Sequence, residues 1–137
     1  VHILKGYKQM LTRYSELVMP QDANVVGTLF GGQMVSWMDI SAAKAVHRFL
    51  KDTEADTALT RAIDAIEFKE PVYVGNWVNF EANIIKVGKT SIIIQVNAYK
   101  EDNKEEPVLA CKAIFTMVTV KKLNSGLFKK VNHNKIL

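Results

Sequence analysis

Hydrophobic and polar residues follow two different periods along this chain. Over residues 31–50 the apolar positions recur at steps of three and four, which is the spacing of one face of a helix. From residue 57 onwards the step is two, which is typical of strands with one buried face. The predicted strands cover residues 11–19, 57–68, 77–87, 90–100 and 107–120. The pattern therefore predicts one strand, one long helix and then a run of strands.

Short connections separate the later strands, and short connections favour antiparallel pairing between neighbours. A single helix covers only one face of such a sheet, so the predicted fold class is α+β. Residues 92–94 and 113–115 are consecutive apolar runs, which predict apolar side chains on both faces. A strand of that kind needs a second cover. Because the chain shows no internal repeat, we expect another copy of the chain to supply it.

Composition narrows the class of protein. A length of 137 residues suits one domain. No apolar run approaches the roughly 18 residues that a membrane span needs, and residues 1–14 lack the apolar segment of a signal peptide. The single cysteine, Cys111, excludes an intramolecular disulfide and fits a reducing compartment. We therefore expect a cytoplasmic protein without a membrane partner.

The net charge is +4, and the basic residues gather near the ends of the chain. This charge weakly favours a polyanionic partner. Nucleic-acid binding would need a basic face with interleaved aromatic residues or a known module, and we expect none here. The histidines and the cysteine are too scattered to predict a metal site. We expect residues 123–137 to be a basic, solvated and partly mobile tail.

Asp39 lies within the apolar stripe of the predicted helix, four residues after Val35 and three before Ala42. A buried carboxylate is costly unless it is hydrogen-bonded or paired, and this position is too far into the helix for an N-cap. Two interpretations stay open. The carboxylate is a general base or nucleophile, or it reaches water or an interface partner from the edge of the stripe.

Gly31 and Gly32 stand where a loop enters the predicted helix, and glycines let a substrate approach the backbone closely. The first N–H groups of a helix lack an intrahelical partner and carry the positive end of its dipole. Such donors can hold an oxyanion, although the pair could equally serve only a tight turn. Asn24 in the preceding loop could orient a water or a carbonyl, but a lone loop Asn is more often a turn residue.

Other nucleophiles are poor candidates. Ser36 and Ser41 lack the G-x-S-x-G setting of a nucleophile elbow. His47 follows Asp39 by eight residues, about 12 Å along a straight helix at roughly 1.5 Å per residue, so a triad is excluded. Cys111 lies in a predicted strand, and no residue that could act as a base is near it in the sequence. A lone cysteine in such a place is usually a small buried hydrophobic residue, so we do not expect it to be the nucleophile.

Taken together, these residues resemble the opening motif of the hotdog acyl-CoA thioesterases, most closely the YciA-like bacterial enzymes and their cytosolic acyl-CoA hydrolase relatives. The matching residues are Met19, Pro20, Asp22, Asn24, Gly27, Phe30, Gly31, Gly32 and Asp39, followed by Arg61, Phe68, Pro71, Gly75 and residues 87–91. The likeness covers about residues 12–120. It departs at Asn76, where related sequences usually carry Asp.

The resemblance implies a hotdog fold over residues 1–122, with an antiparallel sheet wrapped around one long central helix. It implies that Asp39 acts as base or nucleophile, that the Gly32 N–H polarises the thioester carbonyl, and that Asn24 places the water or thioester. Asn24 and Asp39 would come from different chains of a homodimer, and such dimers often assemble into trimers of dimers. The residues implied in substrate binding are Phe30, Gly31, Arg61, Lys89, Thr90 and Ser91, the last four near the CoA nucleotide.

The resemblance therefore implies hydrolysis of acyl-CoA to CoA and a carboxylic acid, with CoA as part of the substrate and no further cofactor. Met34, Trp37 and Met38 could line the acyl channel, although ordinary core packing is the more frequent role of such a stripe. A non-catalytic acyl-CoA-binding protein is the main alternative. A lyase acting on enoyl-CoA ranks last, because it would need an Asp–His pair and His47 is badly placed.

Overall fold

The computed structural model describes residues 11–136, so most of the segment examined for a signal peptide lies outside the described residues. In chain order the elements are β1 (Thr12–Leu17), the short 3-10 helix η1 (Pro20–Asp22), α2 (Gly31–Phe49), β2 (Thr57–Phe68), β3 (Trp77–Val87), β4 (Ser91–Glu101), β5 (Val108–Lys122) and β6 (Phe128–Lys130). The predicted helix and strands are confirmed to within two residues at each end. Strand β6 was not predicted.

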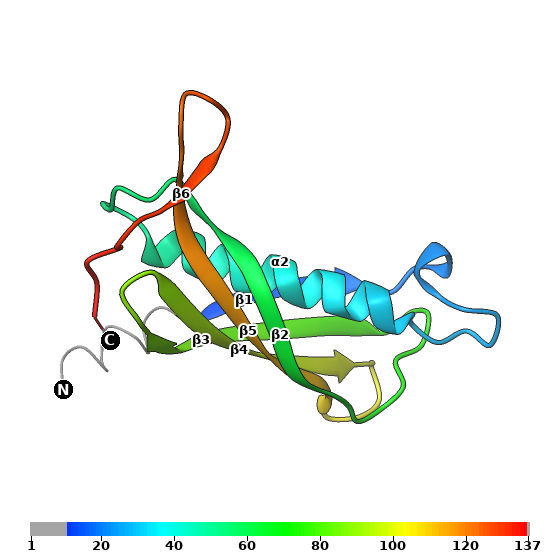
Figure 1. Cartoon of the computed structure of the whole chain (residues 1–137). Coiled ribbons are helices and arrows are strands. Elements are labelled where there is room, and N and C mark those ends of the chain that lie inside the picture. Colours follow the sequence, from blue (N-terminus) through cyan, green and yellow to red (C-terminus); the bar gives the residue numbers. More distant parts are fainter. Residues whose placement is uncertain (1–10, 137) are drawn as a thin grey trace.

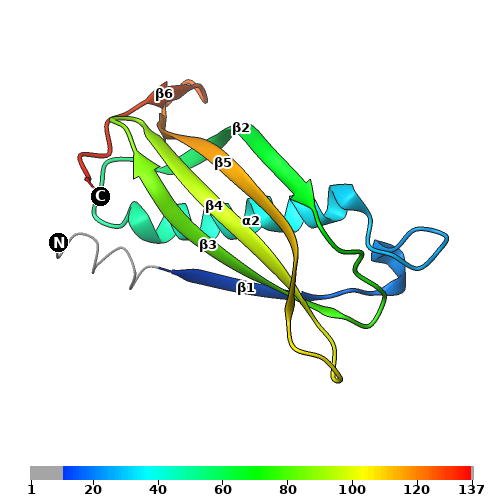
Figure 2. The same cartoon turned by 90° about the horizontal axis from the view of Figure 1, so that it is seen from below.

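All strands pair antiparallel in one sheet of order β1-β3-β4-β5-β2, and β6 pairs with the far end of β5. Figure 2 shows the long strands side by side, with α2 running along one face of the sheet. This arrangement confirms the hotdog fold. The expected pairing of consecutive strands is confirmed for β3, β4 and β5, but it is wrong for β2, which pairs with β5. Residues 69–76 are too long for a tight hairpin, and β1 occupies the free edge of β3.

Helix α2 runs along the inner face of the sheet (Figure 1). Its apolar stripe is buried in the core between the two. Met34, Trp37 and Met38 are all buried in this core, and the Trp37 ring meets the Phe80 ring edge-on at 6.3 Å between centroids. The fully buried sheet residues facing the helix include Val78, Phe80, Ala82, Ile92, Ile94, Val96 and Phe115. Core packing, the more frequent role of such a stripe, is therefore confirmed for Trp37 and Met38, whereas Met34 packs in the core and also lines a hollow beside the start of the helix.

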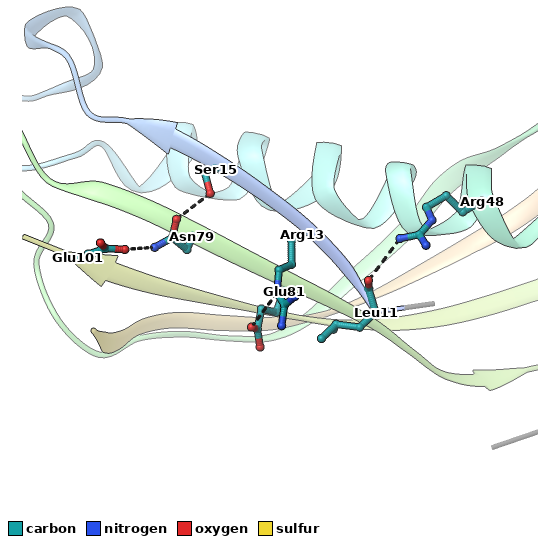
Figure 3. A network of polar contacts seen from close by, with 7 residues as sticks. All are labelled: Leu11, Arg13, Ser15, Arg48, Asn79, Glu81 and Glu101. Atoms are coloured by element: carbon teal, nitrogen blue, oxygen red, sulfur yellow. Dashed lines mark hydrogen bonds and ion pairs between the residues drawn. The ribbon is translucent and has the colours of Figure 1, made fainter. Parts of the chain in front are cut away.

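The outer face of the sheet is mostly polar. Ile93 and Ile114 do lie on it, half-buried, but most of their neighbours are amide, hydroxyl or charged side chains. The sequence-based expectation of an apolar outer face is thus wrong for most of the sheet. The polar contacts of its β1 side run from Ser15 to Asn79 (2.7 Å) and on to Glu101 (2.6 Å), with a separate ion pair beside them (Figure 3).

Two bulges interrupt β2 where it pairs with β5. The first falls between Thr60 and Ala62 and leaves Arg61 without a partner in the ladder. The second falls between Asp64 and Glu67, where Ala65 has a φ of +52°. Bulges re-aim side chains and bend a strand locally, and both of these lie in the part of β2 that follows Thr60.

The segment expected to be a separate basic tail folds back onto the domain. Strand β6 pairs with β5, and the N–H of His133 donates to the carbonyl of Lys89 at 3.1 Å. The His133 ring is buried and lies edge-on to Phe49, 5.7 Å between centroids. Residues 131–136 therefore cover the end of α2 and the β3–β4 turn. Within residues 11–136 no helix is long and apolar enough to cross a bilayer.

Candidate active site

Asp39 lies near the middle of α2 and is half-buried. The hydroxyl of Thr60 on β2 donates a hydrogen bond to its Oδ1 at 2.6 Å. Thr60 lies opposite the buried Met117 in the ladder, so its side chain points to the helix side of the sheet. Among the described residues, no lysine or arginine forms an ion pair with Asp39, and no donor reaches its Oδ2. The second oxygen is therefore free to accept a proton.

Sequence reasoning missed Thr60. The only sequence signal is a hydroxyl residue at an inward position of an alternating strand, which is common in sheets. The contact joins residues 21 positions apart in the chain. A short hydrogen bond to an ionised acceptor is among the stronger polar contacts in proteins. Thr60 therefore fixes the orientation of the Asp39 carboxylate.

The N-terminus of α2 offers free donors. Phe30 is the N-cap and supplies no side-chain hydrogen bond. Among residues 11–136, no acceptor takes the N–H of Gly31, Gly32 or Gln33, and the first helical bond runs from the N–H of Met34 to the carbonyl of Phe30. A Cβ added at Gly32 would meet nothing within 4 Å. This helix end can therefore receive an oxyanion, as the sequence indicated.

The loop before α2 is held by Asp22. Its carboxylate accepts the N–H of Met19 at 2.9 Å and the side-chain amide of Gln33 at 3.1 Å, and its carbonyl accepts the N–H of Phe30 at 3.0 Å. These contacts join the loop to the first turn of the helix. Asp22 is therefore a positioning residue for the free N–H groups, a role that the sequence motif did not specify.

Asn24 closes a turn within the same loop. Its Oδ1 accepts the N–H groups of Val26 and Thr28, each at 3.1 Å, and its Nδ2 donates to the Thr28 hydroxyl at 2.7 Å. This is the turn-forming geometry that a loop Asn commonly adopts. One hydrogen of Nδ2 reaches no acceptor among residues 11–136. A catalytic role for Asn24 stays a prediction, and only this hydrogen could carry it.

A hollow of about 230 Å³ lies beside the helix N-terminus. Its walls are Thr28, Leu29, Gly31, Met34, Phe68, Lys69, Glu70, Pro71 and Val72. The ring of Phe68 lies against Gly31, where an added Cβ would come within 3.3 Å of it. Glycine at position 31 therefore allows the aromatic ring to pack directly on the helix backbone.

One chain does not bring the predicted site residues together. Asp39 follows Gly32 by seven residues, which places the two about 10 Å apart along the helix axis at roughly 1.5 Å per residue. Asn24, Phe30 and Gly31 lie at the same end as Gly32, remote from the acid. A base and an oxyanion donor that act on one carbonyl must each reach it within hydrogen-bonding distance, about 3 Å.

The residues predicted to lie near the CoA nucleotide are separate from both Asp39 and the start of α2. Lys89 and Thr90 form the β3–β4 turn and Ser91 begins β4. Ser91 pairs with Val118 on β5, which pairs in turn with Leu59 on β2. This turn is therefore about 10 Å from the bulge of Arg61, at roughly 4.8 Å per strand spacing. The Arg61 side chain is exposed beside Thr60.

Two of the alternative nucleophiles, Ser41 and Cys111, are excluded by their surroundings. The hydroxyl of Ser41 is buried and donates to the Trp37 carbonyl at 2.9 Å. Cys111 is fully buried, and burial raises the pKa of its thiol to about 11. Among residues 11–136 no group of His, Cys, Asp and Glu side chains is placed to hold a metal ion.

Strand β2 forms an edge of the sheet in this chain. Its exposed side chains include Leu59, Ile66 and Phe68, and Ile40 of the neighbouring helix is also exposed. An unpaired edge with exposed apolar side chains is a template for pairing with another strand. The edge passes directly beside Asp39, because it carries Thr60.

Known proteins resemble this chain in sequence. A family model described as the thioesterase superfamily matches residues 26–107. The chain is 36% identical over 110 residues to a Buchnera aphidicola protein named an uncharacterized acyl-CoA thioester hydrolase, covering 77% of this chain and 78% of that one. It is 33% identical over 108 residues to the acyl-CoA thioester hydrolase YciA of Salmonella typhimurium, covering 76% and 78%.

Solved structures give the same result. The hexameric thioesterase of Yersinia pestis superposes with a TM-score of 0.75 at 30% identity, over 88% of this chain and 93% of that one. An apo-hexameric acyl-CoA thioesterase superposes with a TM-score of 0.77 at 29% identity, over 92% and 78%. From its sequence match, its relatives and its fold, the chain belongs to the thioesterase superfamily.

Proposed function

We propose that this chain hydrolyses acyl-CoA thioesters to free CoA and a carboxylic acid. In the proposed step Asp39 removes a proton from a water molecule, whose oxygen bonds to the thioester carbon. The carbonyl oxygen becomes an oxyanion held by the Gly32 N–H. The carbon–sulfur bond then breaks, and the proton on Asp39 passes to the leaving thiolate. No metal or additional cofactor enters this balance.

The observation that supports the proposal most directly is the state of Asp39. It is a half-buried carboxylate, oriented by the Thr60 hydroxyl and left with one free oxygen, in a chain of the thioesterase superfamily. A general base needs a fixed direction and an accessible lone pair. Attack by the carboxylate itself would use the same oxygen, so the geometry accommodates either the base or the nucleophile.

We infer that the complete site forms between two chains. Because Asp39 and Gly32 of one chain are about 10 Å apart along the helix, at roughly 1.5 Å per residue, they cannot meet at one carbonyl. A second copy paired along the β2 edge would bring its own helix N-terminus towards Asp39. The same pairing would cover the exposed Leu59 and Ile66. Solved relatives described as hexameric favour three such dimers in one assembly.

Substrate contacts follow from the same arrangement. The hollow beside Gly31 and Phe68 offers mostly apolar walls to the part of the substrate near the carbonyl. Phe30, the exposed N-cap of α2, precedes Gly31 in the chain and is available to the same part of the substrate. The remaining hydrogen on Asn24 Nδ2 is available to the attacking water. Arg61 and the turn of Lys89, Thr90 and Ser91 supply cationic and hydroxyl groups that suit nucleotide phosphates.

The test is release of free thiol from acyl-CoAs of short, branched, medium and long chains. Asp39→Asn should lower turnover by about 10²- to 10⁴-fold, which is the range for loss of a general base, while CoA binding is retained. Asp64→Asn is the matched control, because Asp64 is an exposed carboxylate on β2. Near-normal turnover of Asp39→Asn would exclude the proposed base. Binding without thiol release at any chain length would instead identify a non-catalytic acyl-CoA-binding protein.

A further inference from the structure

The β5–β6 hairpin projects from the body of the domain at the end where α2 finishes (Figure 1). We call residues 121–130, with the sequence KKLNSGLFKK, the basic hairpin. Every one of these residues is exposed. Four are lysines and three are large apolar residues, so the segment combines concentrated positive charge with exposed apolar surface.

The basic hairpin has a defined structure. Lys121 pairs with Lys129 in the ladder, and the N–H of Leu123 donates to the carbonyl of Leu127 at 2.7 Å. The N–H of Gly126 donates to the carbonyl of Leu123 at 2.9 Å, with Gly126 at a φ of +87°. This is a tight hairpin turn whose left-handed position suits glycine. The lysines and the apolar residues are therefore presented together by a formed turn.

The lysines carry positive charge that the domain does not neutralise. Lys121 and Lys129 lie directly opposite each other, and like charges in that position are destabilising. None of the ion pairs among residues 11–136 includes a lysine of the basic hairpin. At the base of the hairpin the carboxylate of Asp56 accepts the backbone N–H of Lys122 at 2.7 Å, so this contact does not involve the ammonium group of the lysine. The rest of the hairpin complements a negatively charged surface.

The apolar residues distinguish between negatively charged partners. Leu123 is 41% exposed, Leu127 68% and Phe128 51%, and they lie closer to the turn than Lys121 and Lys129 do. A nucleic acid would contact the charged groups but would leave these apolar side chains in water. A lipid bilayer accepts apolar side chains in its acyl region and attracts lysines to its headgroups. Behind the polar turn, Leu123 and Leu127 come before all four lysines, and Phe128 lies opposite Lys122. The outer part of the hairpin is thus apolar and its base cationic, which matches the order of those two layers.

We propose that the basic hairpin binds the surface of an anionic lipid bilayer. Leu123, Leu127 and Phe128 enter the boundary between headgroups and acyl chains, and the lysines contact the lipid phosphates. The polar residues Asn124 and Ser125 at the turn limit the depth of insertion to that boundary. The expectation of no membrane partner rested on the lack of a spanning segment, and a peripheral contact of this kind needs none.

Binding is measured by co-sedimentation with phosphatidylcholine vesicles and with vesicles that also contain phosphatidylserine. The whole chain should bind the second and not the first. A lysine near an anionic surface contributes roughly a fivefold factor in partitioning. Lys121→Gln with Lys129→Gln should therefore weaken binding by about 25-fold. Lys104→Gln with Lys112→Gln is the matched control, because it removes the same charge from other exposed or half-buried positions outside the hairpin and should leave binding within about twofold.

A second variant separates lipid from other polyanions. Leu127→Ser with Phe128→Ser keeps every lysine and should also lose vesicle binding. Vesicle binding that survives both hairpin variants would overturn the proposal. So would binding to a DNA duplex that depends on the lysines but not on the apolar pair, or a change of oligomeric state in the hairpin variants, which would make the hairpin a contact between copies. These measurements need no hydrolysis, so they stand apart from the proposed thioesterase activity.

Discussion

A chain with a damaged base should rescue a chain with a damaged oxyanion donor if the site is shared between copies. The two perturbations are Asp39→Asn and Gly32→Pro. Proline at position 32 removes the N–H in the first turn of α2, where proline is tolerated and where this N–H has no partner among residues 11–136. Gly32→Ala is the control, because its Cβ meets nothing within 4 Å and the N–H is kept.

The expected magnitudes follow from the geometry. Asp39→Asn should lose about 10²- to 10⁴-fold in turnover, and Gly32→Pro about 10²- to 10³-fold for one oxyanion donor. A mixed dimer contains one site with both changes and one site with neither. Random pairing makes half of the dimers mixed, so an unselected mixture should recover about a quarter of wild-type activity, and mixed dimers selected on both tags should recover about half.

The assay is thiol release by the two chains co-expressed with different tags and purified on both. Each parent variant alone provides the baseline, and mixing after purification without subunit exchange provides a further control. Activity no higher than that of the parents would refute the shared site, because a site within one chain would carry a lesion in every copy. Wild-type activity in the Gly32→Pro variant by itself would show that the Gly32 N–H has no part in the mechanism.

Other predictions test single features. Thr60→Val should lower turnover by about 10- to 100-fold, the effect of losing a hydrogen bond to a charged group, whereas Thr60→Ser should keep most activity; equal rates would separate Thr60 from catalysis. Ala65→Gly should raise the unfolding free energy by about 1 kcal/mol in denaturant titration, because Ala65 has a φ of +52°. Ala62→Gly, in the same strand without that φ, should lower it by about 0.5–1 kcal/mol. Cys111 should react with a disulfide reagent near pH 8 far more slowly in the native protein than in denaturant. Its raised pKa, about 11, keeps the folded thiol protonated, and equal rates would show that the thiol is open to solvent.

The helix and most strands could be predicted from the sequence, because the spacing of apolar residues in each element depends only on the local backbone geometry. The three- and four-residue steps that place Met34 and Met38 on one face arise from the helical turn, whatever the partner is. The same step made Asp39 conspicuous as a carboxylate inside an apolar stripe. Alternation in β3 likewise predicted which side chains point inwards, since successive side chains on a strand alternate between faces.

Other features depended on which distant segments meet. The pairing of β2 with β5, the hydrogen bond from Thr60 to Asp39 and the docking of His133 on Phe49 join positions far apart in the chain. No periodicity encodes such contacts, because they depend on loop closure and on which sheet edge is free. The short β6 strand was missed for the same reason, since it exists only through its pairing with β5.

The same distinction between sequence and tertiary structure applies to the candidate site. The residue types and their order, from the glycine pair to Asp39, were visible in the sequence and resembled a known family. Only the structure showed that Thr60 orients Asp39 at the middle of α2, away from the free N–H of Gly32 at its start. Only the structure showed that turn contacts occupy most of the Asn24 side chain. The chain by itself determines the parts of the site, because residue type is local. The rigid length of α2 keeps Asp39 and Gly32 of one chain about 10 Å apart, at roughly 1.5 Å per residue, which supports the proposed site between two copies.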